Sequence, residues 1–144
     1  MKKLFVVSAV AAVIVAAALV ATVQAQKSKK VVYESSAQAT YKPSQMKGVA
    51  MAAVWGDADK GAHGTFTKFD AGYDAGMHTH TNDVSIVVIK GAYLYKDEAG
   101  EKRVGPGDYL MVPGGHKHWS GGDKTEGAVF YEEGSGKFDL VTAK

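Results

Sequence analysis

After a long apolar stretch at its start, the chain alternates short runs of apolar and β-branched residues with turns rich in glycine. The runs have the length of strands and lack the 3.6-residue period of an amphipathic helix. We therefore expect about eight to ten short strands and no helix beyond the N-terminal segment. The expected strands include residues 49–55, 63–70, 84–90, 92–95, 109–112, 128–132 and 138–141.

Two of these runs are apolar at almost every position. Residues 49–55 read VAMAAVW, and residues 84–89 read VSIVVI. A strand that is apolar on both faces is typical of a sheet covered on both sides, so we expect both strands to be buried on both faces. Together with turns such as residues 97–100, the pattern predicts an all-β barrel or sandwich over residues 48–144.

The N-terminus has the organisation of a signal peptide. Lys2 and Lys3 precede an apolar run from residue 4 to residue 23, and small residues at Val23 and Ala25 suit signal peptidase. We expect a signal peptide over residues 1–25 and an exported, periplasmic or secreted protein. The alternative is an uncleaved membrane anchor, since the run is long enough to span a bilayer.

Residues 26–47 are polar and predict an N-terminal arm ahead of the barrel. Within this arm, residues 31–33 (VVY) are expected to form a short strand that pairs with a second subunit. The chain would then be a homodimer.

Composition narrows the chemistry. A length of 144 residues suits one domain, and the absence of Cys excludes disulfides, thiolate metal sites and a Cys nucleophile. Without Lys2 and Lys3, the 17 Lys and Arg become 15, which balance the 15 Asp and Glu. No basic patch with interleaved aromatic residues is present, so nucleic acid is not expected as a partner. Motifs of serine hydrolases, NTPases and glycosidases are absent as well.

Three histidines are the candidate chemistry. His78 and His80 stand two residues apart, and such positions share one face of an extended strand. His118 ends a later run that reads GDYLMVPGGHKH. Imidazole is the commonest metal-binding side chain, so three of them converging from two segments predict a metal site.

These segments resemble the two signature motifs of the cupin superfamily, over roughly residues 72–122. The motifs read G-x5-H-x-H-x(3,4)-E-x6-G and G-x5-P-x-G-x2-H-x3-N. Val84 stands where the first motif has Glu, and Gly122 stands where the second has Asn. The segments VWGD, GTFTKF and GKFD are more loosely similar to small exported cupins related to the sensor domain of the ChrR anti-sigma factor. The matching positions are Gly72, His78, His80, Gly91, Gly107, Pro113, Gly115 and His118.

The resemblance implies a conical, double-stranded jelly-roll-like β-barrel with one divalent transition metal near its open end. His78, His80 and His118 would be the ligands of Fe, Zn, Mn, Ni or Cu, since imidazoles alone do not select the metal. His116, at the parity of His118, and Asn82, at the parity of His80, are candidate additional ligands.

Other side chains have two readings. His63 is read as an ordinary strand histidine, with a role at the pocket as the alternative. Met77 and Met111 would matter only for Cu(I) and are otherwise expected in the core. Aromatic residues either line the mouth of the site or pack in the core, namely Tyr93, Tyr95, Trp119 and Phe130.

Three functions remain open. Similarity to three-histidine dioxygenases implies a metal-dependent oxygenase that acts on a small enolisable or phenolic substrate. The alternative is a non-catalytic binding or sensor protein for a metal or small ligand. A second alternative is a metal-free structural module.

Overall fold

The computed structural model describes residues 30–143, where all regular secondary structure is β-strand. A six-stranded sheet has the order β1-β2-β3-β10-β5-β8, and a five-stranded sheet has the order β11-β4-β9-β6-β7. All strand pairs within the described residues are antiparallel, in agreement with the predicted all-β fold. The strands are β1 Lys42–Pro43, β2 Val49–Gly56, β3 His63–Phe69, β4 Asp74–Thr79, β5 Val84–Gly91, β6 Tyr93–Asp97, β7 Gly100–Val104, β8 Tyr109–Val112, β9 His118–Gly122, β10 Ala128–Gly134 and β11 Val141–Thr142.

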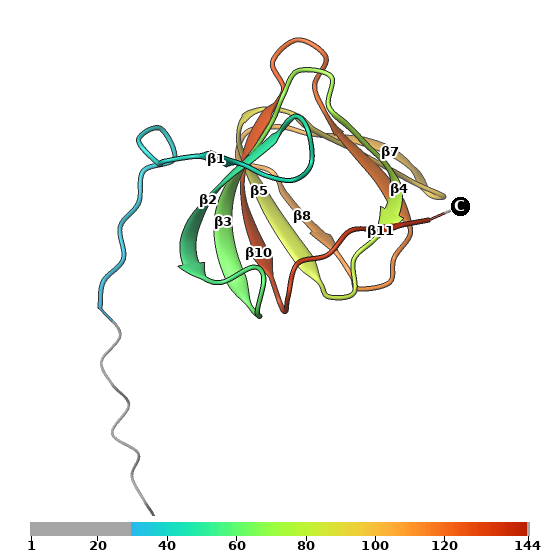
Figure 1. Cartoon of the computed structure of the whole chain (residues 1–144). Coiled ribbons are helices and arrows are strands. Elements are labelled where there is room, and N and C mark those ends of the chain that lie inside the picture. Colours follow the sequence, from blue (N-terminus) through green and yellow to red (C-terminus); the bar gives the residue numbers. More distant parts are fainter. Residues whose placement is uncertain (1–29, 144) are drawn as a thin grey trace, which may run out of the picture. The chain divides into compact units, whose positions relative to one another are not determined.

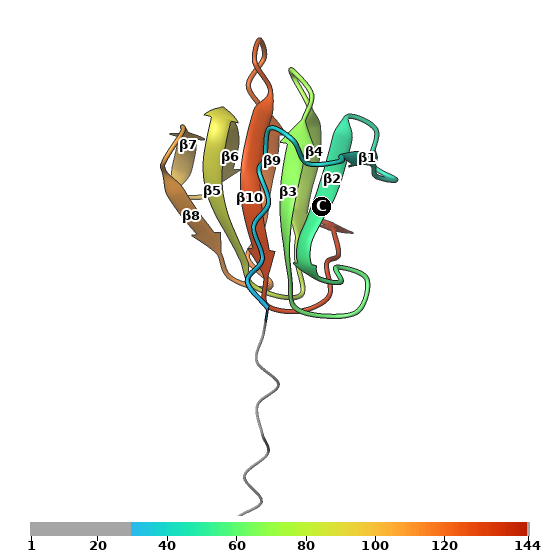
Figure 2. The ribbon, with the colours of Figure 1, turned by 90° about the vertical axis from the view of Figure 1, so that its left-hand side faces the viewer.

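The two sheets face each other and enclose the interior of the barrel (Figures 1 and 2). β10 lies between β3 and β5, and β9 lies between β4 and β6, so strands far apart in sequence are neighbours in each sheet. The two central strands bring residues from the second half of the chain into register with the first cupin-like motif.

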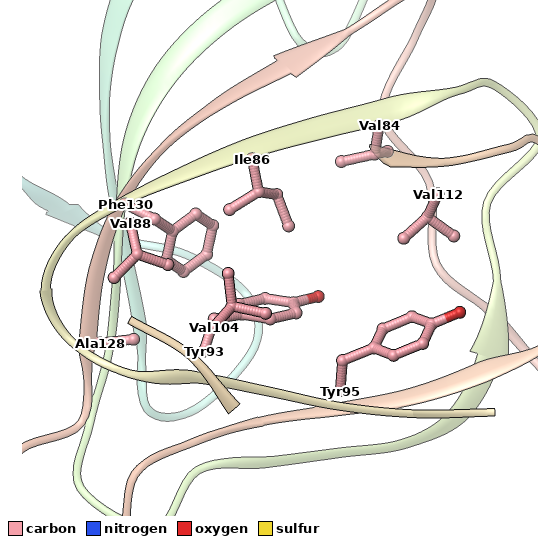
Figure 3. Packing of buried hydrophobic residues seen from close by; sticks show 9 residues of the cluster. All are labelled: Val84, Ile86, Val88, Tyr93, Tyr95, Val104, Val112, Ala128 and Phe130. Carbon is pink, nitrogen blue, oxygen red and sulfur yellow. The ribbon is translucent and has the colours of Figure 1, made fainter. Parts of the chain in front are cut away.

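The core runs along the interior between the two sheets, from Val88 and Phe130 to Val84 and Val112 (Figure 3). Phe130 of β10 is fully buried, and its ring packs edge-on against Phe69 at 4.9 Å and Tyr93 at 5.2 Å between centroids. Alternate residues of β5, beginning at Val84, point inward onto this cluster because successive side chains of a strand face opposite ways. The cluster reaches the histidines, because its member Tyr95 stacks on His118.

The prediction that residues 49–55 and 84–89 are covered on both faces is wrong. In β5, Val87 and Ile89 are 37% and 38% exposed, and Trp55 of β2 is 41% exposed. Among the described residues, only the inner face of each strand packs against the opposite sheet, so outward apolar residues meet solvent. Apolar parity alone does not reveal whether a second layer covers a sheet.

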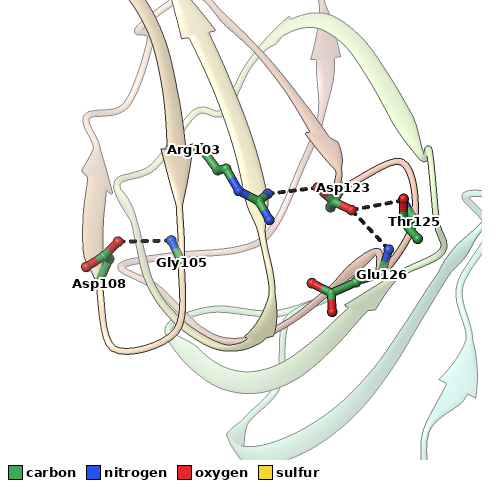
Figure 4. A network of polar contacts seen from close by, with 6 residues as sticks. All are labelled: Arg103, Gly105, Asp108, Asp123, Thr125 and Glu126. Carbon is green, nitrogen blue, oxygen red and sulfur yellow. Dashed lines mark hydrogen bonds and ion pairs between the residues drawn. The ribbon is translucent and has the colours of Figure 1, made fainter.

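Aspartates fix the turns of the barrel (Figure 4). The carboxylate of Asp108 accepts the N–H of Gly105 at 2.9 Å and closes the turn between β7 and β8. The carboxylate of Asp123 accepts two backbone N–H groups of its own turn and pairs with Arg103 at 2.8 Å. The predicted hairpin turn at residues 97–100 is confirmed, since Asp97 and Gly100 are the terminal partners of β6 and β7.

The N-terminal arm carries one short strand, β1, which pairs with β2. Residues 32 and 33 form no strand, and Val32 and Tyr33 are 60% and 84% exposed. The expected pairing of this segment with a second subunit therefore stays a prediction. The predicted signal peptide and its cleavage site at Ala25 lie outside the described residues. Between residues 30 and 143, no helix has the length and apolar character of a membrane span.

Candidate metal centre

Strand pairing brings the three predicted histidines together. His78 near the end of β4 is the direct ladder partner of His118, the first residue of β9. His80 follows β4 on the same side, as its spacing from His78 predicts. The ring centroids lie 4.2 Å apart for His78 and His118, 4.9 Å for His78 and His80, and 5.4 Å for His80 and His118. One nitrogen from each ring lies within 4.8 Å of the other two, so the three could hold one metal ion.

Backbone carbonyls fix the orientation of each ring. The Nδ1 atoms of His78, His80 and His118 lie 2.8, 2.5 and 3.0 Å from the carbonyl oxygens of Gly76, Asp139 and His116. A carbonyl oxygen only accepts, so each Nδ1 carries the proton and donates it. Each Nε2 is therefore left with a free lone pair, which is the tautomer that a metal ligand requires.

Burial keeps the three imidazoles neutral. Their exposed fractions are 1%, 8% and 0%, and desolvation lowers the pKa of each below its ordinary value. Each neighbouring imidazole lowers the pKa of the next, because two cations in this space would repel. Within the described chain, the buried Nε2 of His118 has no hydrogen-bond partner. A metal ion at the centre would supply that partner, so these residues fit a metal.

The last part of the chain completes the centre. The carbonyl of Asp139 accepts from His80, and its carboxylate accepts the backbone N–H of Thr81 at 2.8 Å. β11 then pairs with β4, placing Val141 opposite Thr79 and Thr142 opposite His78. The ring of Phe138 lies 5.4 Å from that of His80.

Of the two candidate additional ligands, His116 is not part of the three-histidine cluster, and the side chain of Asn82 has a hydrogen-bond partner elsewhere. The Nε2 of His116 is 3.1 Å from the carboxylate of Asp97, which also accepts the hydroxyl of Tyr95. Asn82 donates its side-chain N–H to the carbonyl of Lys137 at 3.0 Å. Among the described residues, the candidate metal-binding cluster therefore consists of the three histidines and contains no carboxylate.

Whether the aromatic and methionine residues point into or out of the barrel follows from their alternation along the strands. Tyr93, Tyr95 and Phe130 are buried, and the Tyr95 ring stacks on that of His118 at 5.5 Å between centroids. Trp119 donates its indole N–H to Asp74 outside the barrel. The expectation that Met77 and Met111 pack in the core is wrong: they are 36% and 47% exposed, because they alternate with inward residues.

An inner cavity adjoins the histidines. Its volume is about 30 Å³, which is room for two or three water molecules at about 10–15 Å³ each. It meets an outer groove of about 900 Å³ at residues that line both, including Met46, Met51, Phe138 and Leu140. Polar side chains of the inner cavity are Thr67, His78, His80, Tyr93, Ser120 and Glu132.

The sequence analysis missed one buried polar residue, Glu132, and left the role of a second, His63, open. Glu132 is 6% exposed and shares the inner cavity with His78 and His80. His63, read as an ordinary strand histidine, is 1% exposed and lines the outer groove, with Nδ1 near the carbonyls of Gly61 and Gly136. The signal for Glu132 was its parity with the apolar Phe130 in the expected strand.

Comparison with known proteins adds a family and a fold. The model of a family described as a domain of unknown function (DUF4437) matches residues 27–144. No curated protein matches the sequence. The structure is similar to that of the polyketide cyclase RemF from Streptomyces resistomycificus, with a TM-score of 0.67 and 14% identity over 80% of this chain and 87% of that one.

Two further solved structures have a similar fold. KdgF from Halomonas sp. has a TM-score of 0.58 and 20% identity, over 74% of this chain and 94% of that one. An RmlC-like cupin from Shewanella frigidimarina has a TM-score of 0.57 and 16% identity, over 72% and 89%. Identities of this size establish the fold and carry no substrate across.

Proposed function

The chain belongs to the DUF4437 family and has the cupin fold, and we propose that it is a metal-binding cupin with a three-histidine centre. The observation that supports this proposal is the convergence of His78, His80 and His118, each with Nδ1 held by a carbonyl. Carbonyl partners of this kind orient ligating imidazoles in metal sites.

The donor set indicates the class of metal and ligand. Three neutral nitrogens suit a divalent transition metal (Fe, Zn, Mn, Ni or Cu). Val84 stands where the cupin motif has a Glu, so the three histidines bring no negative charge to the metal. The centre would therefore keep the full charge of the ion and favour anionic oxygen ligands. When bound, the metal would act as a Lewis acid on a ligand oxygen.

We propose that the bound molecule is small and enolisable or phenolic, and that the protein is an enzyme acting on it, of the oxygenase type. The outer groove of about 900 Å³ could hold most of such a molecule, and only a group the size of a few waters would enter the inner cavity. The proposal extends to export through the N-terminal segment and to a homodimer formed through the arm.

A second candidate is a non-catalytic protein that binds a metal or a small ligand. The small volume of the inner cavity, about 30 Å³, favours this function because it leaves little space for a substrate beside the metal. Measuring both stability and turnover distinguishes the two candidates. A binding protein is stabilised by its ligand and leaves the ligand unchanged, whereas an enzyme converts it.

The test is metal analysis of the protein purified without added metal, and again after reconstitution with divalent ions. We expect close to one metal per chain in the wild type and in His116→Ala, and none in His78→Ala/His118→Ala. The His116 variant is the matched control because its side chain lies outside the cluster and its backbone carbonyl is retained. A wild-type protein without metal after reconstitution would refute the proposal and favour the structural module.

A further inference from the structure

Glu132 is a buried carboxyl that the structure of the barrel does not explain. It lies on β10 between the inward residues Phe130 and Gly134 and is 6% exposed. Within residues 30–143, its Oε1 has no hydrogen-bond partner. Burying an unpaired carboxyl costs free energy, and an apolar residue would serve packing better. Such a group is expected where a ligand supplies the missing partner.

The register of the six-stranded sheet places Glu132 in the inner cavity that His78 and His80 also line. Val84, at the position of the motif carboxylate, is the ladder partner of Gly134, and Glu132 pairs with Ile86 two residues further. Glu132 is therefore the diagonal inward neighbour of Val84 on the adjacent strand. A carboxyl absent from β5 is thus present on β10, outside the ligand cluster and in the same inner cavity as His78 and His80.

The groups that face Glu132 leave it without a counter-ion. Thr65 of β3 and Ile86 of β5 flank it in the sheet, and Tyr93 of β6 faces it from the opposite sheet. The hydroxyl of Tyr93 is hydrogen-bonded to Ser120. In the described part of the chain, no Lys or Arg lines the inner cavity. Desolvation accordingly raises the pKa of Glu132 from 4.5 to about 7, where a carboxyl can both give and take a proton.

We propose that Glu132 is the acid–base group of this cavity, contacting a small carbonyl compound bound beside the three histidines and exchanging a proton with it. In the forward step, Oε1 takes a proton from the carbon next to the carbonyl. The C–H electron pair becomes the C=C bond, and the carbonyl π pair moves onto oxygen, giving an enolate and neutral Glu132. The reverse step returns the proton to carbon, so no oxidant or reductant is consumed.

This inference rests on the proposed function, because the enolate oxygen needs a positive centre nearby. It narrows the substrate class to carbonyl compounds with an acidic neighbouring C–H. It also assigns separate roles to the two sheets. The histidines, on the side of the five-stranded sheet, would hold the metal, and the carboxyl of Glu132, on β10 of the six-stranded sheet, would exchange the proton.

The experiment measures deuterium uptake from D2O into pyruvate and hydroxyacetone by ¹H NMR with zinc-loaded full chain. Three proteins are compared: wild type, Glu132→Gln and Glu133→Gln. The second variant is the matched control, because Glu133 makes the same change on the exposed face of β10. We expect uptake in wild type and Glu133→Gln, and a loss of at least about 100-fold in Glu132→Gln, the size of general acid–base effects.

Metal content, measured on the same samples, separates the two proposals. If wild type holds neither zinc nor any other divalent transition metal after reconstitution, the proposed function fails and this inference with it. If all three proteins hold zinc but uptake is absent in wild type or equal in Glu132→Gln, the metal centre stands and the role of Glu132 is refuted.

A second readout does not depend on turnover or on the variant folding. ¹³C NMR of protein with labelled glutamate carboxyls follows Glu132 in metal-loaded wild type as pyruvate is added. We expect a shift of the Glu132 resonance, and no shift of the Glu133 resonance. An unchanged Glu132 signal at saturating pyruvate would show that the carboxyl does not contact the ligand and would overturn the inference.

Discussion

Replacing Glu132 by Gln should remove one component of the pH dependence of stability. The native carboxyl titrates at about 7 because burial disfavours its charge, against 4.5 for an exposed glutamate. Between these values the folded state holds a proton that the unfolded state has lost. Wild-type stability is therefore fully present below the unfolded pKa and is lost as the pH rises through the folded pKa. Gln has no proton to lose.

The structure gives the size of the effect. At about 1.4 kcal/mol for each pH unit of pKa difference, the wild type should lose about 2–3 kcal/mol relative to Glu132→Gln between about pH 5 and about pH 8. The histidines act in the opposite direction, because their lowered pKa values remove stability as the pH falls below their ordinary range. Their contribution is common to both proteins and cancels in the difference.

Urea unfolding of metal-free protein measures this difference at several pH values. The free energies of unfolding of wild type, Glu132→Gln and Glu133→Gln are compared, with chelator present throughout. Glu133 is exposed, so its variant should follow the wild-type curve. Parallel curves for wild type and Glu132→Gln would show that the buried carboxyl is ionised without cost, and would refute the reasoning.

Three other predictions concern the core, a turn and the metal. Phe130→Ala should cost about 3–5 kcal/mol in urea unfolding, since the ring is fully buried; an unchanged midpoint would contradict the packing described. Gly91→Ala should cost about 1–3 kcal/mol, because φ is 69° and a Cβ would lie 2.3 Å from the carbonyl of Gly127, whereas Gly105→Ala, with its nearest atom at 3.6 Å, should be near neutral. Free metal at about 100 times its Kd should stabilise wild type by about 2.7 kcal/mol, and a chelator should lower Tm in wild type but not in His78→Ala/His118→Ala.

Parity and motif spacing predicted much of the centre. Two histidines at i and i+2 must share a face of a strand, and the second motif supplied His118, so their convergence followed from the sequence. The direct pairing of His78 with His118 could not be predicted from the sequence, because the register of one strand pair depends on the other strand pairs of the sheet. β9 was also missed: its sequence HWSGG has few residues that favour strands, and its neighbours β4 and β6 impose the extended conformation.

Glu132 shows the opposite limit. A charged residue at the end of an expected strand is ordinarily read as solvated, and parity with Phe130 was the only sign that it points inward. The same uncertainty affected β5, where outward Val87 and Ile89 look identical in sequence to buried residues. Burial is set by what covers each face, and that is a property of the tertiary fold.

The hydrogen bond from His80 to the carbonyl of Asp139 has a consequence for biosynthesis. These residues are 59 positions apart, and β11, which follows Asp139, pairs with the strand that carries His78. A nascent chain that has emerged only as far as His118 would have all three imidazoles but no partner for His80. Translation therefore delivers the ligands well before the segment that orients them, and high-affinity metal capture should be a late, post-translational event.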